Sequence, residues 1–205
     1  MAEFWSWFLA NLSWIPMSPL EIVATVFGLW SVIEYVRENA RSWPTGLINV
    51  LLYIVLFWHG GLYADTGLQV VFVVLQIYGW WQWTRGGEQG HGLAITRTSL
   101  RLWSILAAIA VAAIVPIGLA LARFTDSTVP WWDAIPTVLS LIAQWMISKK
   151  KLENWLVWIL VDLLFIPLYI YKGYYLTAAL YGVFLVLCCL GLRSWTRTRR
   201  SPSAA

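Results

Sequence analysis

Charged residues are scarce in this sequence. Only 12% of its 205 residues are Asp, Glu, Lys or Arg, whereas 60% are apolar and the mean hydropathy is +0.68. A typical soluble domain is about a quarter charged. We therefore expect the surplus of apolar side chains to face lipid. The chain is long enough for about seven membrane-spanning helices with short loops, and we expect no additional soluble domain within it.

Cysteine and catalytic motifs are nearly absent as well. The only two cysteines, Cys188 and Cys189, are adjacent in an apolar run, so they cannot build a disulfide framework or a Cys-rich metal site. The sequence contains no zinc-protease, nucleophile-elbow or phosphate-loop motif. We therefore expect no catalytic residues, no metal, no cofactor and no ATP-driven motor. The same absence argues against a membrane-embedded enzyme, and only the number of spans favours a receptor.

Apolar runs separated by turn residues predict the membrane-spanning helices. Residues 1–17 carry Glu3 but no Lys or Arg, so they lack the basic region of a signal peptide. Their aromatic side chains predict a helix that lies at the membrane surface. Each later run is close to the ~20 residues that cross a bilayer. The expected spans are 18–36, 43–60, 64–84, 102–122, 131–148, 155–172 and 175–193.

Basic residues are divided unevenly between the two sides of these predicted helices. Arg123 and Lys172 lie in loops on one side, and the other 12 of the 14 Lys and Arg residues lie on the opposite side. The positive-inside rule therefore places the N-terminus outside and the C-terminus in the cytoplasm. The net charge of +4 is explained as a topology signal and does not indicate nucleic-acid binding.

Residues 42–85 recur at 154–197 with a constant offset of 112, without a gap and with 16 identities in 44 positions. The matches include Gly, Trp, Tyr and Arg, which chance similarity between apolar stretches would not keep in register. Four membrane crossings separate equivalent points, so the two copies have the same orientation, an arrangement typical of transporters. We expect an all-α integral membrane protein with two parallel three-helix repeats and a linker helix (3+1+3). The expected units are 1–17 (interfacial segment), 18–85 (first repeat), 86–129 (linker with the fourth helix), 130–197 (second repeat) and 198–205 (cytoplasmic tail).

One predicted helix, 155–172, carries aromatic side chains and a single acid on one face. The residues are spaced by three and four positions: Trp155, Trp158, Asp162, Phe165 and Tyr169. An Asp at the centre of a span costs about 2.5–3.5 kcal/mol, so it indicates a functional role. Aromatic rings beside a carboxylate suit a flat cation. The alternative is that Asp162 only forms a hydrogen bond with a neighbouring helix.

The first repeat lacks the acid and one of the rings. Gly46 and Val50 stand where the second repeat has Trp158 and Asp162. A single asymmetric ligand would need such a difference, and we expect Gly46 to leave room for it. Because the predicted spans contain no chain of acids that could relay protons, passive facilitated diffusion is the simplest mechanism.

Polar and aromatic groups elsewhere in the spans are further candidates. Amides can bind ring edges or hydroxyl groups of a substrate, or can join helices to one another. Trp80 and Trp81 have no aromatic counterpart in the second repeat, so we expect one of them to face the pathway. Trp83 recurs as Trp195, as expected for an aromatic belt at the membrane surface. The amides are Asn49, Gln76, Gln144 and Asn154.

Three tracts, 43–50, 76–83 and 154–158, resemble the bacterial nicotinamide riboside transporter (PnuC) family. The last tract contains the W-x-x-W pattern typical of that family, and the resemblance extends from Ser18 to Arg197. It implies a SWEET-like fold, a homotrimer and facilitated diffusion of a vitamin precursor across the inner membrane. It also implies trapping of the substrate by a cytoplasmic kinase. The resemblance implies that Trp155 and Trp158 contact the substrate. It suggests Asn154, Gln144 and Asn49 as further substrate-contacting positions.

Members of the wider family specialise in thiamine or riboflavin, and these alternatives stay open. Nicotinamide riboside and thiamine are flat cations that suit Trp158 and Asp162, whereas riboflavin is neutral and larger. A sugar facilitator is a different class that would not need the acid. The full set of candidate binding residues is Trp155, Trp158, Asp162, Asn154, Gln144, Asn49, Tyr169 and Trp80.

Overall fold

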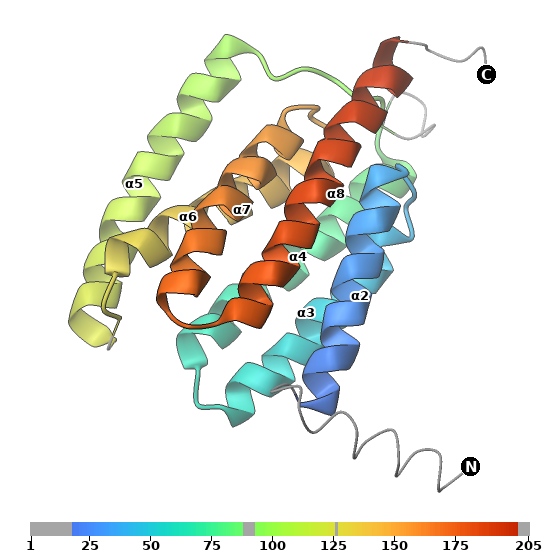
Figure 1. Cartoon of the computed structure of the whole chain (residues 1–205). Coiled ribbons are helices and arrows are strands. Elements are labelled where there is room, and N and C mark those ends of the chain that lie inside the picture. The colour runs from blue at the N-terminus through green and yellow to red at the C-terminus, as the bar shows by residue number, and fades with distance from the viewer. Residues whose placement is uncertain (1–17, 88–92, 126, 201–205) are drawn as a thin grey trace, which may run out of the picture.

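The described part of the chain is a bundle of seven α-helices without a β-strand (Figure 1). The computed structural model describes residues 18–87, 93–125 and 127–200. The expected surface helix at residues 1–17 and the end of the expected tail lie outside the described residues. The helices are α2 (Pro19–Val36), α3 (Ser42–His59), α4 (Tyr63–Arg85), α5 (Leu100–Phe124), α6 (Pro130–Ser148), α7 (Asn154–Tyr171) and α8 (Tyr175–Arg200).

Five of the described helices are long and apolar enough to cross a membrane: α2, α3, α5, α7 and α8. The remaining two are less hydrophobic because polar and acidic residues interrupt them. Gln76 lies within α4, for example, and Gln144 lies within α6. Length and composition therefore support a multi-pass membrane protein.

The helix ends follow local sequence signals. The Ser18 Oγ accepts a hydrogen bond from the Glu21 N–H at 3.2 Å, and Pro19 occupies the first turn of α2. Ser99 caps α5 in the same way. Helix α8 continues to Arg200 instead of ending near residue 193, because Trp195 is buried against α2 and stabilises the last turns.

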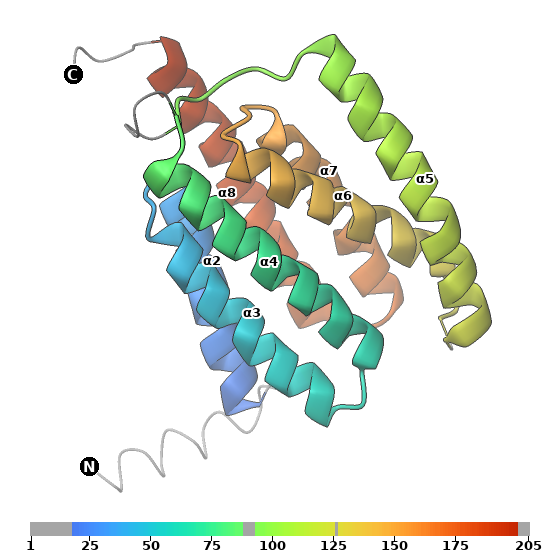
Figure 2. The same cartoon turned by 180° about the vertical axis from the view of Figure 1, so that it is seen from behind.

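The helices pack in two groups that meet at two places. α2 packs against α3 and α3 against α4, while α6 packs against α7 and α7 against α8. The groups meet where α4 contacts α6 and where α2 contacts α8. α5 packs against α6 and lies at the edge of the bundle (Figure 2).

Two loops with the same backbone conformation lie at one end of the bundle, here named the basic end because most Lys and Arg residues gather there. Glu38 has φ 57° and Lys150 has φ 46°, and the two positions are 112 residues apart. Their side chains form an ion pair at 3.7 Å, and the Lys150 Nζ lies 4.6 Å from the centre of the Trp83 ring. Burial lowers the pKa of Lys150, and the carboxylate of Glu38 opposes that shift. The ion pair therefore joins the two loops.

A pair of reciprocal hydrogen bonds joins the two helix groups beside these loops. The Trp83 Nε1 donates to the carbonyl oxygen of Ile147, and the Trp195 Nε1 donates to the carbonyl oxygen of Tyr35, each at 3.0 Å. Both the donors and the acceptors are 112 residues apart, so the two bonds are equivalent. Both indoles are buried. The expectation that they form an aromatic belt at the membrane surface is therefore wrong, because they pack between the two groups.

Close packing of an indole on a glycine also occurs once in each group. Trp43 lies on Gly79, and Trp155 lies on Gly191. A Cβ atom added at Gly191 would lie 2.5 Å from the Trp155 ring. Both indoles are fully buried, so neither ring can easily move away.

We expect Gly191→Ala to destabilise the protein by about 1–3 kcal/mol, the usual cost of overpacking. Gly182→Ala in the same helix is the matched control, because no atom lies within 4 Å of a Cβ added there. The melting temperature of each purified variant in detergent measures the effect. Equal melting temperatures for the two variants would contradict the close packing of Trp155 on Gly191.

Candidate substrate-binding site

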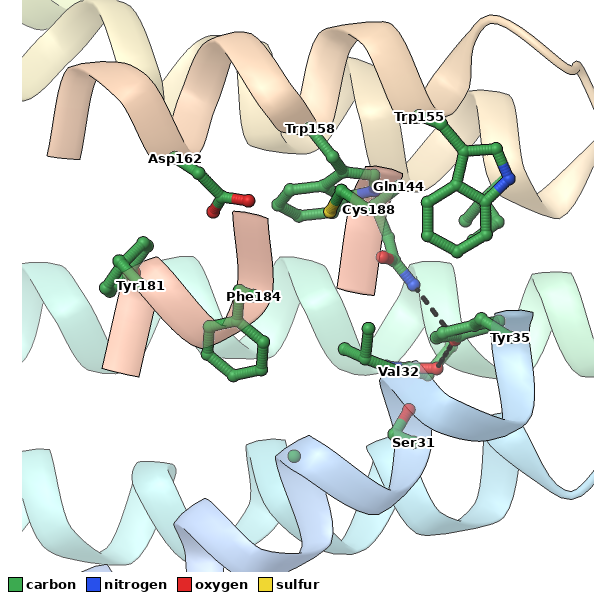
Figure 3. A pocket seen from close by; sticks show the side chains of 13 residues that line it. Ser31, Val32, Tyr35, Gln144, Trp155, Trp158, Asp162, Tyr181, Phe184 and Cys188 are labelled. Atoms are coloured by element: carbon green, nitrogen blue, oxygen red, sulfur yellow. Dashed lines mark hydrogen bonds between the residues drawn. The ribbon is translucent and has the colours of Figure 1, made fainter. Parts of the chain in front are cut away.

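A cavity of about 180 Å³ lies inside the bundle, bounded by α2, α4, α6, α7 and α8 (Figure 3). Helix α3 contributes no residue to its lining, and neither does α5. Most of the lining is apolar or aromatic, and a few polar groups converge on it, as is usual for small-molecule sites.

Four of the eight candidate residues line this cavity. Trp155, Trp158 and Asp162 come from one face of α7, and Gln144 comes from α6. The spacing of three and four residues explains why the α7 side chains reach the same space. Trp158 is half-buried and packs beside both hydrophobic clusters of the bundle.

The other four candidates are not among the lining residues. The Asn154 Nδ2 donates to the carbonyl oxygen of Lys151 at 2.6 Å, and the Asn49 Nδ2 donates to that of Ala24 at 2.6 Å. Asn154 thus closes the turn before α7, and Asn49 ties α3 to α2. Tyr169 packs against Tyr181, a lining residue, with 5.1 Å between the two ring centroids. Trp80 is 41% exposed on the outer surface of the bundle.

Gly46 does not provide space for a ligand, contrary to expectation. A Cβ atom at this position would lie 2.8 Å from the Ser31 Oγ and would collide with the Gln76 amide. The missing side chain therefore lets α3 pack closely on α2 and α4. Gly46 and its counterpart Trp158 thus have different roles, because α7 borders the cavity and α3 does not.

Asp162 is the carboxylic acid among the lining residues. It lies midway along α7, is 2% exposed, and its Oδ2 has no hydrogen-bond partner among the described residues. The Cys188 thiol is a hydrogen-bond partner of the carboxyl group. A buried carboxylate with one unpaired oxygen is still costly, above all in the middle of a membrane. A ligand that brings a positive charge or a hydrogen-bond donor would remove part of that cost.

Sequence reasoning missed Tyr35, which lies at the polar end of the cavity. Its hydroxyl donates to the Gln76 Oε1 at 2.9 Å and accepts from the Gln144 Nε2 at 3.4 Å. The two glutamines could be recognised in the sequence as candidates, because they are polar residues within predicted spans. Tyr35 could not be recognised in this way, since a tyrosine near the end of a span is typical of the membrane surface.

The cavity therefore has two chemically different ends. Asp162 and Tyr181 lie at one end, and Tyr35 lies at the other, with Trp158 between them (Figure 3). One end offers aromatic faces and a carboxylate, which suit a flat cation. The other end offers a phenol and an amide, which suit hydrogen-bonding groups.

Known proteins resemble the chain over nearly its whole length. A sequence profile of the nicotinamide mononucleotide transporter family matches residues 18–197. The nicotinamide riboside transporter PnuC of Escherichia coli is 28% identical over 215 residues, covering 93% of this chain and 88% of the relative. The riboflavin/roseoflavin transporter RibM of Streptomyces davaonensis is 31% identical over 187 residues, covering 88% of this chain and 86% of the relative.

The fold is also known from experiment. The crystal structure of the vitamin B3 transporter PnuC superposes with a TM-score of 0.74 at 25% sequence identity, covering 95% of this chain and 88% of that one. The sequence profile, the relatives and the crystal structure agree on one class of membrane transporters. The chain belongs to the nicotinamide mononucleotide transporter family.

Proposed function

We propose that this protein carries nicotinamide riboside across the bacterial inner membrane by facilitated diffusion. The observation that supports this most is the presence of Trp158 and Asp162 in one cavity halfway along α7, where one oxygen of the Asp162 carboxylate has no hydrogen-bond partner among the described residues. A pyridinium ring can stack on the indole while its positive charge lies near the acid. The Escherichia coli relative is a nicotinamide riboside transporter, which supports the same substrate.

Riboflavin is the second candidate, because RibM is 31% identical to this chain. Its ring system is neutral, however, and would leave Asp162 buried without a counter-charge. Thiamine carries a cationic thiazolium ring and satisfies the acid as nicotinamide riboside does. A sugar would stack on Trp158 but would not need the acid.

We propose that all seven helices cross the membrane as two parallel three-helix repeats joined by α5, in the SWEET-like manner. The contacts support this arrangement, because each of the main helix–helix contacts within or between the two groups has an equivalent at the offset of 112. The paired φ values and the reciprocal indole bonds support it as well. The excess of Lys and Arg at the basic end supports a cytoplasmic location for that end.

Net uptake without an ion gradient needs a step that removes the free substrate. We propose that a cytoplasmic kinase phosphorylates the imported nucleoside and so traps it, and that the chain assembles as a homotrimer. Family resemblance supports both points. Facilitated transport also agrees with the described helices, in which Asp162 is the acid placed at mid-helix among the cavity residues.

Purified protein in proteoliposomes should equilibrate labelled nicotinamide riboside with no imposed gradient. Riboflavin should enter more slowly than nicotinamide riboside or thiamine, because only the cations satisfy Asp162. Empty liposomes are the control. Preferential uptake of riboflavin would contradict the proposed substrate.

Trp158→Ala should weaken the binding of nicotinamide riboside about 5- to 150-fold, since stacking on an aromatic side chain contributes about 1–3 kcal/mol. Trp81→Ala is the matched control, because Trp81 is 51% exposed and does not line the cavity. Calorimetry on folded protein measures both affinities. An equal loss in the two variants would place the substrate elsewhere.

Asp162→Asn should weaken the binding of nicotinamide riboside about 10- to 150-fold, because interactions with a charged group contribute about 1.5–3 kcal/mol. The neutral variant keeps the shape of the cavity and should leave riboflavin affinity unchanged. A thermal-shift titration with each compound gives the comparison. Unchanged affinity for the cation would show that Asp162 only stabilises the helix packing, and would favour a sugar-like mode of binding.

A further inference from the structure

The polar end of the cavity presents hydrogen-bond acceptors. The Tyr35 hydroxyl has one proton and gives it to the Gln76 Oε1, so its oxygen can only accept from a ligand. The Gln144 amide donates to that oxygen through Nε2, and no hydrogen bond from another described residue reaches its Oε1. Both groups line the cavity. A ligand that supplies O–H or N–H donors can therefore bind these two acceptors, while the second N–H of the Gln144 amide can donate to an acceptor of the ligand.

Tyr35 is held rigidly, which is what selective recognition requires. Its ring packs edge-to-face with the rings of Trp43 and Trp83, with distances of 5.0 Å and 5.9 Å between the ring centroids. Its backbone carbonyl accepts the hydrogen bond from Trp195. Its hydroxyl lies between Gln76 of α4 and Gln144 of α6, so five neighbours from four other helices fix its place. A locked acceptor loses little entropy when a ligand binds and tolerates little displacement of its partner.

We propose that Tyr35, together with Gln144, is a specificity-determining residue that binds the hydroxyl-bearing sugar of the substrate while Trp158 and Asp162 bind its cationic ring. This inference rests on the proposed function and assigns the orientation of the substrate within the cavity. The arrangement in Figure 3 supports it, because Tyr35 and Asp162 lie at opposite ends with Trp158 between them. The site then selects a pyridinium nucleoside over a simple pyridinium cation.

The selection follows from the cost of unpaired groups. A site built around buried acceptors rejects an analogue that lacks the matching donor, because the acceptors lose their water without gaining a partner. The ring carboxamide of nicotinamide is another N–H donor that would suit the same acceptors. A comparison of ligands with and without the sugar separates these two orientations.

The test measures the affinity of two ligands for Tyr35→Phe by calorimetry. Nicotinamide riboside carries both the carboxamide and the sugar, whereas 1-methylnicotinamide keeps the cationic ring and the carboxamide but has no sugar. The variant should bind nicotinamide riboside about 10-fold more weakly than the wild type and bind 1-methylnicotinamide unchanged. Phenylalanine keeps the ring contacts and the backbone carbonyl of Tyr35.

Tyr53→Phe is the matched control. It also removes a phenol hydroxyl from the bundle, one that lies 3.3 Å from the Thr25 Oγ1 and does not line the cavity. Its affinity for both ligands should equal that of the wild type. The melting temperature of each variant is measured as well, to check that the variant is folded. If Tyr35→Phe does not fold, Gln144→Met removes the second acceptor from a different helix and should show the same loss for nicotinamide riboside alone.

Three outcomes would overturn the inference. Equal weakening of both ligands by Tyr35→Phe would assign the carboxamide, not the sugar, to Tyr35. Unchanged binding of both ligands would remove Tyr35 from recognition while leaving the proposed function intact, provided that the wild type binds nicotinamide riboside. Failure of the wild type to bind nicotinamide riboside would overturn the proposed function and this inference together.

Discussion

The two helix groups of this protein depend on one reciprocal contact. Each group donates an indole N–H, from Trp83 or Trp195, to a backbone carbonyl of the other group. In a bilayer no hydrophobic effect drives helices together, so close packing and hydrogen bonds must do so. Each of these carbonyl oxygens also accepts a backbone N–H from its own loop, of Glu38 or of Lys150, so the indole is its second donor. The two acceptor residues, Tyr35 and Ile147, also line the cavity, so the contact that joins the groups also shapes the binding site.

The scaffold is repeated, but the chemistry of the cavity is not. Tyr35 in α2 and Ile147 in α6 are equivalent positions, and both line the cavity. One of them carries a hydroxyl and the other does not. The same contrast holds for the equivalent pairs Val32/Gln144 and Gln76/Cys188. A duplicated frame thus encloses a space whose polar groups are distributed unequally, which is what an asymmetric ligand such as a nucleoside requires.

Much of this structure could be predicted from the sequence, and there is a physical reason why the remainder could not. Hydrophobic run length predicts the seven helices, and helical spacing brings Trp155, Trp158 and Asp162 to one cavity. Contacts between helices are not encoded in such spacing. Asn49 and Asn154 carry side-chain amides within the predicted helices, as Gln144 does. Their amides nevertheless donate to backbone carbonyls and do not line the cavity. Gly46 was expected to make space, but the side chains of its neighbours fill it.

The presence of one acid rather than two also follows from the energetics of the site. A second carboxylate near Asp162 would add the repulsion of like charges to the cost of burial, and a ligand with a single positive charge could neutralise only one of them. The first repeat has the apolar Val50 at the equivalent position, buried in α3, which does not border the cavity, so an acid there would be buried out of reach of a ligand. A single acid also lets the empty carrier return across the membrane at a lower cost than a pair would. The lone carboxylate therefore suits a carrier that must bind a monovalent cation firmly enough for selection and weakly enough for release.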